Sequence, residues 1–135
     1  MVGLDAAGAG RLAEQMLTNG ERLTEVWRHV ILQLLDDYES ERRREGTAVA
    51  SGRFDVEPAP TSSRQVDAAL AALAEHLARR DGWRTPAWAV DSRRYAPRWW
   101  FVTPLKGMHA SALQQSPSAF RRRGVFITAD GLVRA

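Results

Sequence analysis

The sequence contains no cysteine among its 135 residues, so it can form no disulfide, thiolate nucleophile or cysteine-ligated zinc site. No stretch approaches the ~18 consecutive apolar residues that a membrane-spanning helix needs. The first residues also lack the basic segment and following apolar run that are typical of a secretory signal. These absences predict a cytoplasmic protein that does not enter a membrane.

Motifs for the common catalytic chemistries are missing as well. The sequence has no H-E-x-x-H, no G-x-S-x-G and no G-x-x-x-x-G-K-[ST]. Residues 8–13 (GAGRLA) fit the dinucleotide pattern only formally, because no buried strand precedes them. His29, His76 and His109 have no second ligand at metal spacing, and His76 is expected at the edge of the core. We therefore expect no enzymatic activity, no metal and no cofactor. A third hypothesis is an enzyme that uses His109 or His76 as acid or base.

Acidic residues are absent between Asp91 and Asp130. The first 60 residues hold seven arginines and eleven acids, whereas the remainder holds twelve basic and five acidic residues, so the two parts have opposite charge. A stretch with charge of one sign favours a solvent-facing surface or an oppositely charged partner. The predicted partner-binding residues in this stretch are Arg93, Arg94, Arg98, Lys106, Arg121, Arg122 and Arg123.

The strongest helical pattern runs from Glu21 to about Arg44, where apolar residues recur every three or four positions. Leu32 lies nearly opposite the main apolar face of this helix. A helix that is apolar on two sides is either central in the fold or meets a partner, so Leu32 joins the predicted partner-binding residues. A shorter helix is predicted over 11–18, with a glycine-type cap at residues 19–20.

Proline and glycine between residues 49 and 63 predict an extended connection. Ser62 and Gln65 have the spacing of a capping box, which predicts a helix from there to about Arg80, ended by Gly82. A last short helix is predicted over 117–123, ended by Gly124 and followed by an extended segment at 125–127.

The fold class predicted from these patterns is mainly α, a small helical bundle with little or no β structure. Its segments are an N-terminal helical hairpin or arm (1–48), the Pro/Gly-rich connection (49–63) and a compact, aromatic-rich C-terminal helical module (64–135). Trp99 and Trp100 are expected in the core, because two adjacent exposed tryptophans would make a costly apolar patch. The alternative is that these rings are exposed and stack on nucleic-acid bases.

Three segments resemble the C-terminal part of a family of small proteins from GC-rich bacteria. They are VDAALAALAEHLARRDGWRTPAWA (66–89), RWWFVTPL (98–105) and SPSAFRRRGVFITADGL (116–132), and the resemblance extends over about residues 54–135. Genes of that family often stand beside nucleotidyltransferase-like toxins or regulators. The resemblance therefore implies an antitoxin-like or accessory role, and it implies no catalytic residues.

The leading functional hypothesis is a non-enzymatic protein-interaction module that binds an acidic protein partner, such as a nucleotidyltransferase-like toxin, through the basic surface or through Leu32. The alternative is a nucleic-acid-binding regulator that uses the basic region 93–123. The charge pattern also allows the acidic N-terminal helix of one copy to lie on the basic half of another as a homodimer, or to fold back within one chain.

Overall fold

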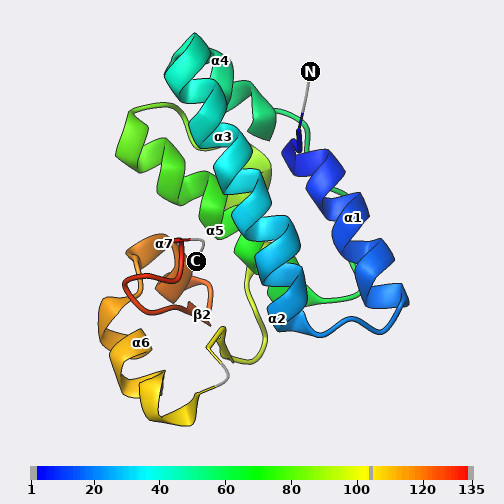
Figure 1. Cartoon of the computed structure of the whole chain (residues 1–135), viewed down its shortest axis with the longest axis vertical. Coiled ribbons are helices and arrows are strands. Elements are labelled where there is room, and N and C mark those ends of the chain that lie inside the picture. Colours follow the sequence, from blue (N-terminus) through cyan, green and yellow to red (C-terminus); the bar gives the residue numbers. More distant parts are fainter. Residues whose placement is uncertain (1–2, 104, 134–135) are drawn as a thin grey trace.

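The computed structural model describes residues 3–103 and 105–133, and it confirms the predicted mainly α fold (Figure 1). Three longer helices form most of the molecule: α1 (Ala6–Thr18), α3 (Leu32–Glu45) and α5 (Arg64–Asp81). In the view of Figure 1, α3 lies between α1 and α5, and the C-terminal residues form a smaller lobe below α5. Within the described residues, no helix has the length and apolar character needed to cross a bilayer.

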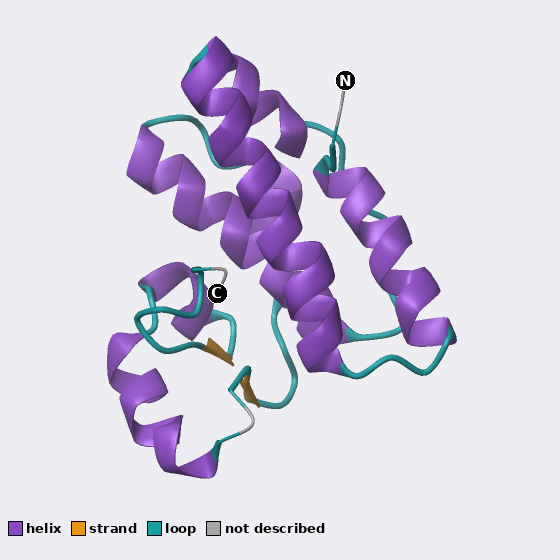
Figure 2. Cartoon of the chain, in the orientation of Figure 1, coloured by secondary structure: helices purple, strands orange, loops and turns teal. Residues whose placement is uncertain are grey.

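The remaining elements are short (Figure 2). The helical ones are α2 (Leu23–Val26), a π-helical turn (Trp27–Ile31), α4 (Thr47–Ala50), α6 (His109–Gln115), α7 (Ser118–Arg122) and 3-10 turns at Ser51–Phe54, Ala87–Val90, Ser92–Arg94 and Lys106–Met108. The strands β1 (Trp100–Phe101) and β2 (Val125–Phe126) pair in parallel, with Trp100 opposite Val125 and Phe101 opposite Phe126.

One cluster of buried apolar side chains joins α1, α3, α5 and the C-terminal lobe, so all three predicted segments contribute to the same core. Trp27 lies at the junction, because its ring is 5.7 Å from the ring of Trp100 and 5.9 Å from that of Phe120. Its indole N–H also donates to the carbonyl oxygen of Gly131 at 3.1 Å. The N-terminal helices therefore fold back within the chain, one of the two arrangements that the charge pattern allows; the homodimer stays a prediction.

The π-helical turn at Trp27–Ile31 corrects the prediction for Leu32. A π turn contains more residues than an α turn, so it rotates every later position relative to a regular helix. Leu32, which regular helical geometry puts opposite the apolar face, is thereby brought into the core and is buried together with Ile31 and Leu35. Leu32 is therefore not available to a partner in this fold, and its apolar side chain serves the protein's own core.

Helix α5 begins and ends close to the predicted positions. Its N-cap is Ser63, one residue after the predicted Ser62, and the Ser63 hydroxyl accepts a hydrogen bond from the Val66 N–H at 3.2 Å. Gly82 ends the helix with φ +79°, in the left-handed region that glycine adopts without a steric penalty. Gly124, with φ +80°, follows α7 in the same conformation, so both predicted glycine stops are confirmed.

The connection 49–63 was predicted to be extended, but its first part is helical. Helix α4 and the 3-10 turn at Ser51–Phe54 follow α3 after Gly46, and only the residues after Phe54 are extended. Phe54 is fully buried, with its ring 5.9 Å from that of Tyr38 and 5.6 Å from that of Trp83. Burial of this ring against Tyr38 of α3 and Trp83, which follows α5, favours compact turns over the extended backbone that the prolines alone suggest.

Candidate functional site

The seven predicted basic residues do not form one surface, and they fall into three groups. Arg94 and Arg123 are buried. Arg93 and Arg122 are exposed but paired with acidic side chains. Among the described residues, Arg98, Lys106 and Arg121 are exposed and make no ion pair. Only this last group is free to meet an acidic partner without breaking a contact inside the fold.

Arg123 is only 1% exposed, which corrects its predicted role in contacting a partner. Its guanidinium donates to a carboxylate oxygen of Glu75, to the carbonyl oxygen of Ala119 at 2.9 Å and to that of Ala89 at 2.7 Å. The same group lies 5.3 Å from the centre of the Tyr95 ring. Arg123 therefore joins α5, α7 and the turn at Ala87–Val90, and its charge is neutralised inside the protein.

Glu75 of α5 receives three arginines. Arg122 and Arg123 donate to its two carboxylate oxygens, and Arg79 forms an ion pair with it at 2.8 Å. Burial by itself would raise the pKa of Glu75, but the hydrogen bonds from Arg123 and Arg122 outweigh that effect and the pKa is lowered. The RRR run therefore places two of its three charges on one acidic residue of the protein itself.

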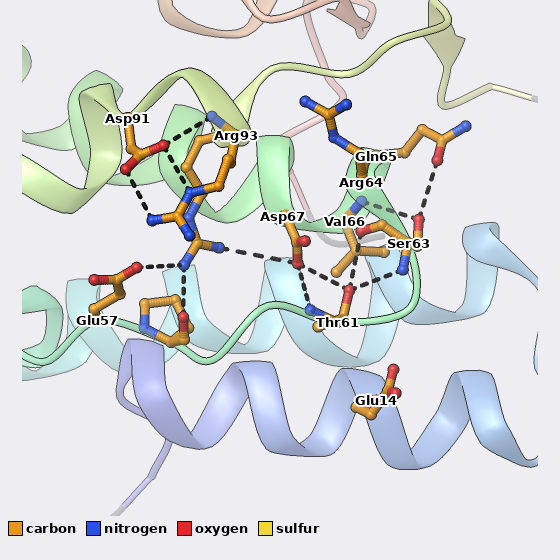
Figure 3. Close-up of polar contacts among 12 residues, drawn as sticks. Glu14, Glu57, Thr61, Ser63, Arg64, Gln65, Val66, Asp67, Asp91 and Arg93 are labelled. Carbon is orange, nitrogen blue, oxygen red and sulfur yellow. Dashed lines mark hydrogen bonds and ion pairs between the residues drawn. The ribbon is translucent and has the colours of Figure 1, made fainter.

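Arg94 is buried in a second polar cluster, so it is not accessible to a partner as predicted. The cluster includes Glu57, Thr61 and Asp67, which are labelled in Figure 3. Its guanidinium donates to the carbonyl oxygen of Pro58 at 2.5 Å and to Glu57 at 3.3 Å. Its second terminal nitrogen has no hydrogen bond and lies 3.9 Å from a carboxylate oxygen of Asp67. The group also lies 5.2 Å from the centre of the Trp88 ring, so Arg94 holds the connection before α5 against the chain that follows α5.

Asp67 also belongs to this cluster, and it lines a pocket of about 350 Å³. One carboxylate oxygen accepts hydrogen bonds from the main-chain N–H and the hydroxyl of Thr61, both at 2.9 Å. Burial raises the pKa of Asp67, and the Thr61 hydrogen bonds and the Arg94 charge only partly oppose that effect. The Thr61 hydroxyl and the Asp67 carboxylate form a hydrogen-bonded pair, and the contacts of Arg94 hold the connection before α5 against the chain that follows α5.

We expect Asp67→Asn to match or exceed the wild type in free energy of unfolding at about pH 7, because the amide oxygen still accepts both Thr61 hydrogen bonds without a buried charge. The folded pKa of Asp67 lies above the ordinary value of 3.8, so the ionised carboxyl costs stability at neutral pH. This cost disappears as the pH falls through the raised pKa. Urea unfolding across that range should therefore show that the free energy of unfolding of the wild type rises relative to that of the variant as the pH falls. A variant clearly less stable than the wild type at neutral pH would contradict this.

The adjacent residues Trp99 and Trp100 have opposite environments. Trp100 is 7% exposed, which confirms its predicted place in the core, but Trp99 is 66% exposed, so the prediction for Trp99 is wrong. Successive side chains of a strand point to opposite faces, and here one face meets the core while the other meets solvent. The two rings therefore do not form one patch, because the strand places them on opposite sides.

Trp99 belongs to a row of aromatic rings on the outer face of the strand pair. Its ring is 5.0 Å from that of Phe126, which is 5.1 Å from that of Phe101. The Phe101 ring in turn stacks on His109 at 4.1 Å with an interplanar angle of 11°. The exposed residues Leu105, Lys106 and Met108 immediately precede His109, and Arg98 precedes Trp99. We call this surface the aromatic–basic face; it comprises Arg98, Trp99, Phe101, Leu105, Lys106, Met108 and His109. The buried Phe126 ring contacts Trp99 and Phe101 and supports this face.

Arg121 lies near this face but is not included in it. It is exposed at the C-terminal end of α7, three residues before Gly124. A side-chain carbon added at Gly124 would lie 3.5 Å from the Trp99 ring, so the end of α7 comes close to that ring. Arg98, Lys106 and Arg121 are exposed positive charges on the same acid-free chain segment as Trp99.

The two histidines considered as acid–base candidates are both in contact with aromatic rings. His76 is half-buried at the edge of the core, as predicted, with its ring 5.9 Å from that of Phe120. Burial lowers its pKa, and the positive charge of Arg80 acts in the same direction. His109 stacks on Phe101 in the aromatic–basic face. Among the described residues, neither ring forms a hydrogen bond with a nucleophilic side chain.

No family model, no curated protein and no solved structure matches this chain. The resemblance of residues 54–135 to the family from GC-rich bacteria therefore stays a prediction. The aromatic–basic face is the feature of the fold from which a function is best argued.

Proposed function

We propose that this protein is a non-enzymatic interaction module whose aromatic–basic face binds an acidic surface of a partner protein. The observation that carries this proposal is the indole of Trp99, 66% exposed on a chain segment without acidic residues. Tryptophan and arginine are the residues that most often dominate binding energy at protein interfaces. The exposed ring of Trp99 is also apolar surface, and its burial by a partner would stabilise the complex.

The charges that remain free favour a protein over a nucleic acid as the partner. Arg93 is paired with Asp91 and Arg122 with Glu75, which leaves Arg98, Lys106 and Arg121 without an acidic neighbour among the described side chains. A protein that neutralises six to ten phosphates needs about that many free cations. Three cations around an apolar row instead resemble the rim and centre of a protein interface.

Under this proposal the partner is a protein with an acidic patch, and the protein acts as an accessory or antitoxin-like subunit in the cytoplasm. The family resemblance supports a nucleotidyltransferase-like enzyme as that partner. Such enzymes hold metal ions with carboxylates, so they offer an acidic surface to a basic module.

A nucleic-acid-binding regulator remains the second candidate, because the exposed Trp99 and the stacked pair of Phe101 and His109 offer ring faces to unstacked bases. The two candidates differ in salt dependence. Binding to single strands should weaken with a slope of about −0.7 in log K against log salt for each neutralised phosphate, whereas a largely apolar protein interface should weaken much less.

We expect the double variant Arg98→Glu, Lys106→Glu to bind the partner at least ~10-fold more weakly, because each reversal replaces an attraction to an acidic surface by a repulsion. The matched control is Arg43→Glu, Arg44→Glu, which makes the same charge change on two exposed residues at the far end of α3. The partner is first captured from the native cell with immobilised wild-type protein, identified, and purified for titration. Equal loss in both double variants, or in neither, would contradict the proposal.

A further inference from the structure

The hydrogen bonds of β1 leave one of its edges open. The N–H of Trp100 donates to the carbonyl oxygen of Gly124 at 2.8 Å, and the N–H of Val102 donates to that of Phe126 at 3.0 Å. In a parallel pair, alternate residues of a strand turn their main-chain groups toward the neighbouring strand. The N–H and C=O of Phe101 therefore point away from β2, toward the side of β1 where the described residues supply no further strand.

The opposite side of the strand pair is covered. Strand β2 packs against α5, α6 and α7, and both of its residues are buried. The residue after it, Ile127, donates its N–H to the hydroxyl of Ser116 at 2.8 Å. The only open edge that the described strands offer is therefore that of β1, which also carries the exposed Trp99 and the half-exposed Phe101.

An open strand edge is a template for another strand, and proteins use it to bind extended peptides. Main-chain hydrogen bonds provide affinity in this mode, and alternate side chains provide specificity. Trp99 and Phe101 lie two residues apart and face the same side, so they match the two-residue repeat of an added strand. Arg98 and Lys106 stand at the two ends of this segment, and no acidic residue occurs between 92 and 129.

Resting on the proposed docking function, we infer that the partner supplies an extended acidic segment of about four to six residues, which pairs with β1 through Phe101 as a third strand. Alternate apolar side chains of the segment cover Trp99 and Phe101, and its carboxylates lie near Arg98 and Lys106. This gives the main-chain groups of Phe101 the partners that they lack in the free protein.

The probe for this inference is a synthetic peptide of alternating glutamate and valine, six residues long and capped at both ends. Two derivatives are N-methylated at alternate amides, one in each of the two registers, which removes the donors on one edge of the peptide and leaves the other edge intact. We expect binding of the parent peptide to slow amide exchange of Phe101 at least ~10-fold, because its N–H becomes hydrogen-bonded. One methylated derivative should lose binding while the other retains it.

The outcomes separate this inference from the proposed function. Equal binding of both methylated derivatives, with unchanged exchange at Phe101, would overturn strand addition but leave docking intact. If the parent peptide does not bind but the partner interaction still depends on Arg98 and Lys106, strand addition is also overturned and docking is kept. If partner binding does not depend on Arg98 and Lys106, the docking function itself is overturned. If oligothymidylate binds with a steep salt dependence, the ligand of this edge is a nucleic-acid single strand and not a peptide.

Discussion

Replacing Arg123 by methionine should lower the free energy of unfolding by about 3–5 kcal/mol, because it removes one partner from a buried ion pair and leaves Glu75 short of a hydrogen bond. The same substitution at Arg121 should change stability by no more than about 0.5 kcal/mol, since that side chain is exposed and makes no ion pair among the described residues. At Arg122 we expect up to about 1 kcal/mol, because its contact with Glu75 is half-exposed and screened by solvent.

The contrast is sharp because the three arginines are consecutive and the substitution is identical. The aliphatic part of methionine replaces much of the volume of the arginine stem, so the packing of the stem is largely kept in each variant. Only at the buried Arg123 is the packing of the guanidinium, including its contact with the Tyr95 ring, lost as well. What differs is the set of groups left without a partner. At Arg123 these are Glu75 and the carbonyl oxygens of Ala89 and Ala119, all inside the fold.

Urea denaturation of the three variants measures these differences, with coincident fluorescence and circular dichroism transitions as the check for two-state unfolding. The double variant Glu75→Gln, Arg123→Met is the control, because it removes the buried charge together with its partner and should recover part of the loss. Equal stability of the Arg121 and Arg123 variants would show that Arg123 does not hold α5 and α7 together.

These neighbouring arginines show which features could be predicted from the sequence and which could not. The end of α7 and the turn at Gly124 follow from local chemistry, since glycine alone adopts the left-handed conformation at little cost. Which arginine points inward depends on Glu75, which is 48 residues away and invisible to a local pattern. Charge counting therefore found the basic region, but it could not separate a structural arginine from a free one.

The same limit explains the other corrections. Leu32 was assigned to a second face because a regular helix turns by a fixed angle per residue, and the π turn before it changes that register. Arg94 seemed free because its partners Glu57, Pro58 and Asp67 belong to other segments. A detectable signal did exist for Trp99: strand alternation at this segment predicts that two adjacent tryptophans face opposite sides.

Substitutions at Trp99 and Trp100 should have opposite effects: one should weaken partner binding, and the other should lower the stability of the fold. Trp99→Ala should weaken partner binding by ~30-fold or more, since truncated interface tryptophans typically lose at least about 2 kcal/mol. The fold should lose no more than about 1.5 kcal/mol, because the ring is mostly exposed and gains chiefly from its contact with Phe126. Trp100→Ala should instead cost about 3–5 kcal/mol of stability, because its ring packs edge-on against Trp27 in the core.

Calorimetric titration with the identified partner and urea unfolding, carried out on both variants, separate the two effects. The measurement on Trp100→Ala is made where the folded fraction is known, so that a loss of binding through unfolding is counted as such. Trp99→Phe provides an intermediate, since it keeps an aromatic ring on the same face of β1 and should recover part of the affinity. If Trp99→Ala bound the partner as well as the wild type, the exposed indole would not be an anchor, and docking through the aromatic–basic face would be excluded, because no other ring of that row is exposed to the same degree.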